Sequence, residues 1–131
     1  MENIDRIGLI GTGVLGSSVG LHLLESGYPL TVFNRTREKT SYLERKGAKV
    51  ADSPEELAKS SNFIITCLKD ANAIRDVSFG KNGIVLGKHD DLVVADMSTI
   101  NPYETIEISQ KFKDSGIMTL DIPVVGGQKA L

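Results

Sequence analysis

The chain lacks the residues and patterns that define several classes of protein. It has one cysteine among 131 residues, which excludes an internal disulfide and provides no cysteine cluster for zinc. No apolar run approaches the roughly 20 residues that span a bilayer. The opening residues Met1, Glu2 and Asn3 do not begin a signal peptide. These absences predict a soluble cytoplasmic protein without a membrane partner.

An excess of charge of one sign is also lacking. The 15 Lys and Arg residues nearly balance the 17 Asp and Glu residues, and the net charge is −2. The composition therefore predicts neither a nucleic-acid partner nor a disordered chain. Hydrophobic residues make up 40% of the sequence. A chain of this length builds one hydrophobic core, so we expect a single domain over residues 1–131.

The most informative stretch is IGLIGTGVLGSSVG, which begins at Ile7. Its apolar start predicts a buried strand, the glycines follow the pattern G-x-G-x-x-G, and a helical pattern begins near Val14. This order is typical of dinucleotide sites, where the glycines permit a tight turn, close approach to a pyrophosphate and packing of the helix on the strand. A purely structural turn is the alternative. The residues expected at the pyrophosphate are Gly11, Thr12, Gly13, Val14, Leu15 and Gly16.

Strands and helices alternate along the rest of the chain. Such alternation predicts a Rossmann-type α/β fold, in which a doubly wound parallel sheet with strand order 3-2-1-4-5-6 lies between two helical layers. We expect helices over about 14–26, 36–46, 71–78 and 102–116, with a short one starting near residue 53. The strands are expected at residues 4–10, 30–33, 48–51, 63–68, 92–95 and 117–122.

Helix starts are marked most clearly at three places. Ser53 is followed by Pro54 and, at the third helical position, Glu56, which together form a capping box. Asn101 precedes a similar proline and glutamate, and Asp70 can cap the helix after the fourth strand. Ligands of doubly wound sheets bind beyond the carboxyl ends of the strands. We therefore expect the site within residues 11–16, 34–36, 68–70, 96–99 and 121–127.

Asn34, Arg35 and Thr36 follow the second expected strand. NAD sites usually have Asp or Glu here, because the carboxylate accepts hydrogen bonds from the adenosine ribose. Asn34 is neutral and does not repel a 2′-phosphate, and Arg35 can bind that phosphate through two hydrogen bonds. Thr36 can cap the next helix, whose first N–H groups add donors. The sequence predicts NADP rather than NAD, the alternative being a surface arginine beside an ordinary cap.

Four stretches together resemble the β-hydroxyacid dehydrogenases, the group that contains 3-hydroxyisobutyrate dehydrogenase, the glyoxylate and succinic semialdehyde reductases and the related 6-phosphogluconate dehydrogenase. They are the glycine stretch, VFNRT at residues 32–36, DMSTINP at residues 96–102 and DIPVVGG at residues 121–127. The resemblance implies hydride transfer between a nicotinamide and a 3-hydroxy acid or the corresponding aldehyde or keto acid. The last two stretches, in this order and spacing, are the more specific ones.

The resemblance also implies roles for individual residues. Leu68 and Lys69 would lie near the nicotinamide ribose, and Thr99 beside the nicotinamide and the substrate. A hydroxyl after the fifth strand agrees with this placement, although a Ser-Thr pair that only starts a loop is the alternative. The substrate carboxylate would be bound by Ser98, Gly126 and Gly127. The alternative for the two glycines is that they only allow the chain to bend.

Two departures from the family pattern bear on activity. Val125 stands where the family usually has a serine that helps bind the substrate carboxylate. The sequence therefore does not identify the substrate. The family's catalytic lysine belongs to a second, helical domain that follows, and Lys129 lies too early to match it. We therefore expect the cofactor domain of a larger, homo-oligomeric enzyme. By itself this domain is expected to be inactive, and to be a monomer or to associate weakly through an exposed edge. The alternatives are an NAD(P)-sensing module of the potassium-channel regulatory type and a relative that binds cofactor without turnover.

Other candidate residues favour structural roles. Cys67 closes an apolar strand, and neither His22 nor His89 has a partner implied by spacing. Tyr103 is not followed by a lysine four residues later, so the Tyr-x-x-x-Lys pair of short-chain dehydrogenases is absent. The aspartates that close the fifth and sixth strands, at positions 96 and 121, are expected to hydrogen-bond loop backbone rather than act as acid and base. No metal site is predicted.

Overall fold

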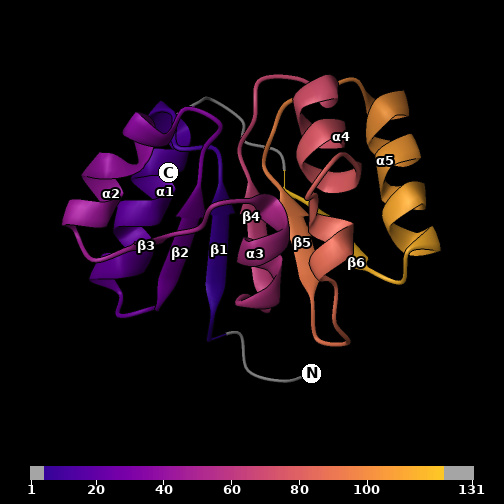
Figure 1. Ribbon diagram of the computed structural model, residues 1–131. Coiled ribbons are helices and arrows are strands. Elements are labelled where there is room, and N and C mark those ends of the chain that lie inside the picture. Colours follow the sequence, from indigo (N-terminus) through magenta and orange to yellow (C-terminus); the bar gives the residue numbers. More distant parts are fainter. Residues whose placement is uncertain (1–4, 123–131) are drawn as a thin grey trace.

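The computed structural model describes residues 5–122 and contains a sheet of six parallel strands. The order is β3-β2-β1-β4-β5-β6, as predicted from the alternation of elements, and it can be followed from one side of Figure 1 to the other. The strands are β1 (Ile7–Ile10), β2 (Leu30–Phe33), β3 (Lys49–Val50), β4 (Phe63–Thr66), β5 (Val93–Asp96) and β6 (Met118–Asp121).

Helical segments connect the strands and cover both faces of the sheet. The α-helices are α1 (Val14–Glu25), α2 (Ser41–Arg45), α3 (Pro54–Lys59), α4 (Ala71–Phe79) and α5 (Pro102–Asp114). Two short 3₁₀ helices, η1 (Arg37–Thr40) and η2 (Ile84–Gly87), complete the described elements. None of the described helices is both long enough and apolar enough to cross a bilayer. The arrangement is the predicted three-layer αβα fold.

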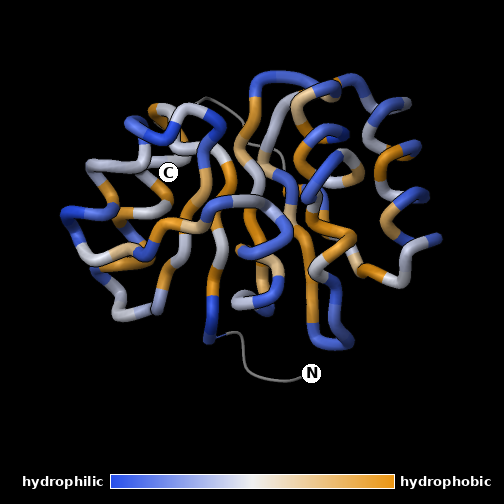
Figure 2. The backbone as a smooth tube through the Cα atoms, viewed as in Figure 1, coloured by the Kyte–Doolittle hydropathy of each residue, from blue (hydrophilic) through white to orange (hydrophobic). Residues whose placement is uncertain are grey.

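The core is divided by the sheet. Leu9 of β1 belongs to one apolar cluster, with side chains of α1 and α2, whereas its neighbour Ile10 belongs to the other, with side chains of α3, α4 and α5. All four residues of β1 are buried, as expected for a central parallel strand covered on both faces. Figure 2 shows the corresponding orange segments along the strands. The fold thereby fixes the carboxyl end of β1, where the glycine loop begins.

The predicted caps are present. The Ser53 hydroxyl oxygen accepts the Glu56 N–H at 3.1 Å, and the Glu56 carboxylate accepts the Asp52 N–H at 3.2 Å. The Asn101 side chain accepts the N–H of Tyr103, and Asp70 accepts that of Ala73, each at 2.8 Å. These side chains bind donors that the first turn of a helix leaves without helical partners.

Several boundaries differ by one to three residues from prediction, and two of the differences bear on the site. β4 ends at Thr66 rather than at residue 68, and the Leu68 N–H donates to the Ser98 hydroxyl oxygen instead of to the main chain of a neighbouring strand. The segment after Thr36 begins as η1 and becomes α-helical only at Ser41. The Thr36 side chain makes no cap hydrogen bond, so the prediction that it caps this helix was wrong. The Thr36 carbonyl instead accepts hydrogen bonds from the Asn34 amide and the Lys39 N–H, which shape a tighter turn.

Candidate functional site: a dinucleotide cavity

The glycine loop joins β1 to α1 through contacts that only glycine allows. Gly11 has φ of +100°, and a Cβ atom there would overlap the Cys67 carbonyl group. A Cβ atom at Gly16 would overlap the Gly11 carbonyl oxygen. A Cβ atom at Gly13 would meet nothing within 4 Å. Gly11 and Gly16 therefore build the loop, and Gly13 leaves its open side free for a ligand.

The first turn of α1 is open to an anion. Gly13 occupies the N-cap position, so the described chain supplies no side-chain cap, and this turn contains no acidic residue. Val14, the first helical residue, is 73% exposed. The N–H groups of a first helical turn have no partners within the helix and lie at the positive end of its dipole. This is a suitable place for a pyrophosphate.

A cavity of about 320 Å³ opens beside this loop at the carboxyl ends of the strands. Seven of the residues predicted for cofactor binding line it, which brings together segments after β1, β2 and β4. Five further residues predicted for cofactor binding do not line the cavity, and their roles remain predictions: Thr12, Val14, Leu15, Gly16 and Thr99. The predicted residues that line the cavity are Gly11, Gly13, Asn34, Arg35, Thr36, Leu68 and Lys69.

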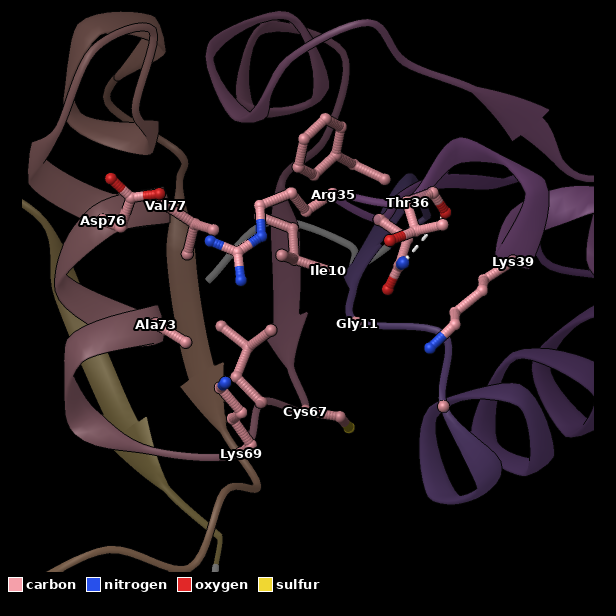
Figure 3. A pocket seen from close by; sticks show the side chains of 14 residues that line it. Ile10, Gly11, Arg35, Thr36, Lys39, Cys67, Lys69, Ala73, Asp76 and Val77 are labelled. Atoms are coloured by element: carbon pink, nitrogen blue, oxygen red, sulfur yellow. Dashed lines mark hydrogen bonds between the residues drawn. The ribbon is translucent and has the colours of Figure 1, made fainter.

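The cavity wall carries mostly positive charge. Arg35, Lys39 and Lys69 line it, and Asp76 is its one acidic residue among those described. Figure 3 shows the Arg35 side chain extending toward α4, while Lys39 points toward the glycine loop. None of the three cations forms an ion pair within residues 5–122. The cavity therefore offers positive charge to a ligand with more than one anionic group.

Lys39 is a candidate that sequence reasoning missed. It lies in η1, and its main-chain N–H donates to the Thr36 carbonyl at 3.0 Å. The 3₁₀ turn brings a residue three positions after Thr36 back over the cavity. The usable signal in the sequence was this spacing from the Asn-Arg-Thr run, but it requires knowing that the turn is a 3₁₀ turn.

Asn34 connects the glycine loop to the segment after β2. Its Oδ1 atom accepts the main-chain N–H of Thr12 at 3.0 Å, and its Nδ2 atom donates to the Thr36 carbonyl at 3.0 Å. The second of these bonds is drawn in Figure 3. Thr12 is 4% exposed, and its hydroxyl donates to the Lys39 carbonyl at 2.8 Å. The buried Thr12 therefore connects the glycine loop, on one side of the cavity, to the segment that carries Arg35 and Lys39 on the other side.

The carboxyl ends of β4 and β5 are joined through Ser98. Its hydroxyl oxygen accepts the Leu68 N–H at 2.8 Å, and only 6% of the residue is exposed. Asp96 accepts the Ser98 N–H at 3.0 Å and the Thr66 hydroxyl at 2.8 Å. This confirms that Asp96 binds loop backbone. Contact of Ser98 with substrate stays a prediction, since its hydroxyl is engaged within the protein, whereas the next residue, Thr99, is exposed.

Cys67 and His89 have structural surroundings, as predicted. Burial, with a smaller contribution from the Asp96 charge, raises the pKa of the Cys67 thiol from its ordinary value of 9.0 to about 12. The thiol therefore stays protonated at neutral pH and is a poor nucleophile. The His89 Nε2 atom lies 2.7 Å from the Ser61 carbonyl oxygen and 3.2 Å from that of Ala58. No group of three metal-ligating side chains occurs between residues 5 and 122.

Part of the predicted substrate site falls outside the described residues. Gly126 and Gly127, expected to bind the substrate carboxylate, and Val125, which replaces the usual serine, belong to residues 123–131. The described part of the site is therefore the cofactor side.

The strand order, the glycine loop and the open helix end define a dinucleotide-binding domain of the Rossmann class. Residues 6–131 match the family described as the NAD binding domain of 6-phosphogluconate dehydrogenase. The chain belongs to this family, which confirms the resemblance inferred from the motifs.

Relatives with similar sequences include two named aldehyde reductases. The 3-sulfolactaldehyde reductase of Escherichia coli (strain K12) is 39% identical over 118 residues, which are 90% of this chain and 40% of that protein. The chloroplastic glyoxylate/succinic semialdehyde reductase 2 of Arabidopsis thaliana is 37% identical over 123 residues, 94% of this chain and 34% of that protein. The chain thus spans less than half the length of these relatives and corresponds to their NAD(P)-binding part.

A solved structure shows the same fold with a bound dinucleotide. Psf3 in complex with NADP⁺ and 2-OPP matches with a TM-score of 0.86 at 30% identity, over 92% of this chain and 43% of that chain. The predicted function as an NAD(P)-binding domain is confirmed at this level. The family description and this structure between them include both NAD and NADP.

Proposed function

We propose that this chain binds NADP and forms the cofactor domain of an enzyme that transfers a hydride between the nicotinamide and a 3-hydroxy acid or the corresponding aldehyde or keto acid. The observation that carries the choice of NADP is the pair of cations, Arg35 and Lys39, in the cavity wall beside the neutral Asn34. The 2′-phosphate of NADP adds negative charge at the adenosine ribose, which NAD lacks. A site with two cations that form no ion pair within residues 5–122, and with no carboxylate at position 34, favours the phosphorylated cofactor.

The residues of the cavity fit the parts of the cofactor in order. The N–H groups at the start of α1 would bind the pyrophosphate, and Arg35, Thr36 and Lys39 would surround the phosphorylated ribose. The purine would then lie toward α4, between the Arg35 side chain and the apolar side chains of Ala73 and Val77. The adenosine half of NADP would thereby meet groups of matching chemistry.

The nicotinamide end would lie at the carboxyl ends of β4 and β5. Leu68 and Lys69 line that end of the cavity, and the exposed Thr99 follows Ser98 on the adjacent strand. The bound cofactor supplies or accepts the hydride. Thr99 would hydrogen-bond the nicotinamide or the reacting substrate oxygen and orient it for transfer. Proton transfer at that oxygen is assigned to a lysine outside this chain, as the family resemblance implies.

The names of the relatives support the substrate class. A sulfolactaldehyde, glyoxylate and succinic semialdehyde are small aldehydes that carry an acid group. We propose a substrate of this kind for the whole protein, together with a homo-oligomeric assembly and a cytoplasmic location. The oxidoreductase names of the relatives favour this function over a regulatory module that only senses nucleotides.

The proposed activity is tested on the full-length protein. Oxidation of NADPH and, separately, of NADH is followed at 340 nm with glyoxylate, succinic semialdehyde or sulfolactaldehyde as the second substrate. We expect turnover of at least one of these compounds, with a higher kcat/KM for NADPH. Binding of NADPH without turnover of any of them would contradict the enzymatic function and support a sensor. A higher kcat/KM for NADH would contradict the choice of cofactor.

A further inference from the structure

The two hydrogen bonds of the Asn34 side chain require opposite chemistry. Oδ1 receives the Thr12 N–H, and Nδ2 gives its hydrogen to the Thr36 carbonyl, each over 3.0 Å. An amide is the side chain that offers an acceptor and a donor at adjacent positions, and only one orientation of this amide satisfies both partners. Asn34 therefore fits its surroundings through its amide and not only through its neutrality.

A carboxylate at position 34 would satisfy one partner and repel the other. One oxygen of Asp could still accept the Thr12 N–H, but the second oxygen would face the Thr36 carbonyl oxygen where Nδ2 now donates. A carboxylate is an acceptor without a hydrogen to give. The Thr36 carbonyl would lose a donor, and two negatively polarised oxygens would be brought together.

The segment affected is the one that carries the cations. Thr36 lies between Arg35 and η1, and its carbonyl also receives the Lys39 N–H at 3.0 Å. The Lys39 carbonyl in turn receives the hydroxyl of Thr12, at 2.8 Å. Thr12 and Asn34 thus hold both ends of the Arg35–Lys39 turn against the glycine loop. Displacing the Thr36 carbonyl would move both cations relative to the first turn of α1.

We propose that Asn34 is a specificity-determining positioning residue, whose amide sets the turn that places Arg35 and Lys39 for the 2′-phosphate. This inference rests on the proposed binding of NADP. It has an unusual consequence for cofactor choice. Asp at this position ordinarily favours NAD by accepting hydrogen bonds from the ribose hydroxyls. In this fold, Asn34→Asp loses NADP without gaining NAD, because the carboxylate disrupts the turn beside which the ribose would bind.

The test compares Asn34→Asp, Asn34→Ala and the matched control Arg35→Ala. Each variant is titrated with NADPH and NADH by calorimetry, and amide hydrogen exchange of the cofactor-free protein is measured by NMR at Thr12 and across residues 35–39. Arg35→Ala removes a proposed phosphate ligand but leaves both bonds of Asn34 in place. Thermal unfolding of each variant separates a local change from a general loss of stability.

For Asn34→Asp we expect at least a tenfold loss of NADPH affinity, NADH affinity within threefold of the parent, and faster exchange at residues 35–39. Asn34→Ala should show the same pattern, with faster exchange also at Thr12. Arg35→Ala should lose NADPH affinity without any change in exchange. This combination of selectivity and local exchange distinguishes positioning from a merely structural role, which would weaken both cofactors equally.

Two results would overturn the inference. One is a tenfold or greater gain in NADH affinity on Asn34→Asp, which would show that the carboxylate binds the ribose as in ordinary NAD sites. The other is unchanged exchange across residues 35–39 in both Asn34 variants, which would show that the amide does not hold the turn. Because exchange is measured without cofactor, it tests the role of Asn34 even where the parent chain binds neither dinucleotide, a result that would count against the proposed function alone.

Discussion

The hydroxyl oxygen of Ser98, after β5, accepts the main-chain N–H of Leu68, after β4, at 2.8 Å. The two residues are 30 positions apart in the sequence, and their bond joins the segments proposed to lie at the nicotinamide end of the cofactor. Asp96 orients the Ser98 backbone by accepting its N–H. This part of the site is therefore held by partly buried hydrogen bonds before any ligand binds.

Removal of the Ser98 hydroxyl should destabilise the fold. Ser98→Ala leaves the partly buried Leu68 N–H without its partner, and the loss of such a hydrogen bond costs about 0.5–1.5 kcal/mol. Urea unfolding followed by circular dichroism measures the change. The control is Ser60→Ala, because Ser60 is exposed and its hydroxyl donates only to carbonyls of its own helix. Equal stability of the two variants would show that the hydrogen bond between Ser98 and the Leu68 N–H does not stabilise the fold.

The two glycines flanking the first turn of α1 should respond differently to alanine. Gly16→Ala places a Cβ atom onto the Gly11 carbonyl and should lower the free energy of unfolding by more than about 3 kcal/mol. Gly13→Ala meets no atom within 4 Å and has φ of −71°, so its cost should stay below about 1 kcal/mol.

The same Gly13→Ala variant should nevertheless bind dinucleotide poorly. Its added methyl group would occupy the open side of the loop where the pyrophosphate is proposed to approach, and we expect at least a tenfold loss of NADPH affinity by calorimetry. Parent-like binding by Gly13→Ala would place the pyrophosphate elsewhere.

Lys39→Ala should weaken NADPH binding because one of the cations in the cavity wall is lost. A charge-assisted contact contributes about 1.5–3 kcal/mol, so at least a tenfold loss is expected, with little change for NADH. Lys49→Ala serves as the matched control, because Lys49 is exposed on β3 and does not line the dinucleotide cavity. An equal effect of the two substitutions would remove Lys39 from the proposed phosphate site.

Cys67 should react slowly in the folded chain. Its pKa of about 12 lies three units above the ordinary value of 9.0, so at pH 8 the reactive thiolate is about a thousandfold scarcer than in a free thiol. Modification by a disulfide reagent should be slow in buffer and fast in urea. The stability gained by keeping this thiol neutral is complete below pH 9 and is lost as the pH rises toward 12. Rapid reaction of the folded chain would contradict the partly buried, protonated thiol.

The sequence was sufficient where the signal is local. The strand order followed from alternating elements, the glycine loop from three spaced glycines, and the caps at Ser53, Asp70 and Asn101 from residue type and position. The glycine loop and the caps depend on residues a few positions apart, whose conformational preferences act within a single turn. The strand order follows from the general rule that alternating strands and helices form right-handed parallel crossovers.

Features that depend on distant partners were not predictable. The neutral character of Asn34 is visible in the sequence. Its hydrogen bond to Thr12 was not predictable, because the two residues are 22 positions apart. The role of Ser98 toward substrate stays a prediction from the family resemblance, and its hydrogen bond to the Leu68 N–H was not foreseen, because that bond depends on the packing of β4 beside β5. Lys39 enters the cavity only because η1 is a 3₁₀ turn.

The choice of NADP is tested most directly by calorimetric titration of this chain with NADPH and with NADH, repeated on Arg35→Ala. We expect the parent chain to bind NADPH at least tenfold more tightly than NADH. Arg35→Ala should lower NADPH affinity by about 1.5–3 kcal/mol while leaving that of NADH nearly unchanged. Equal binding of the two cofactors by the parent, or an equal effect of the substitution on both, would contradict the choice of NADP.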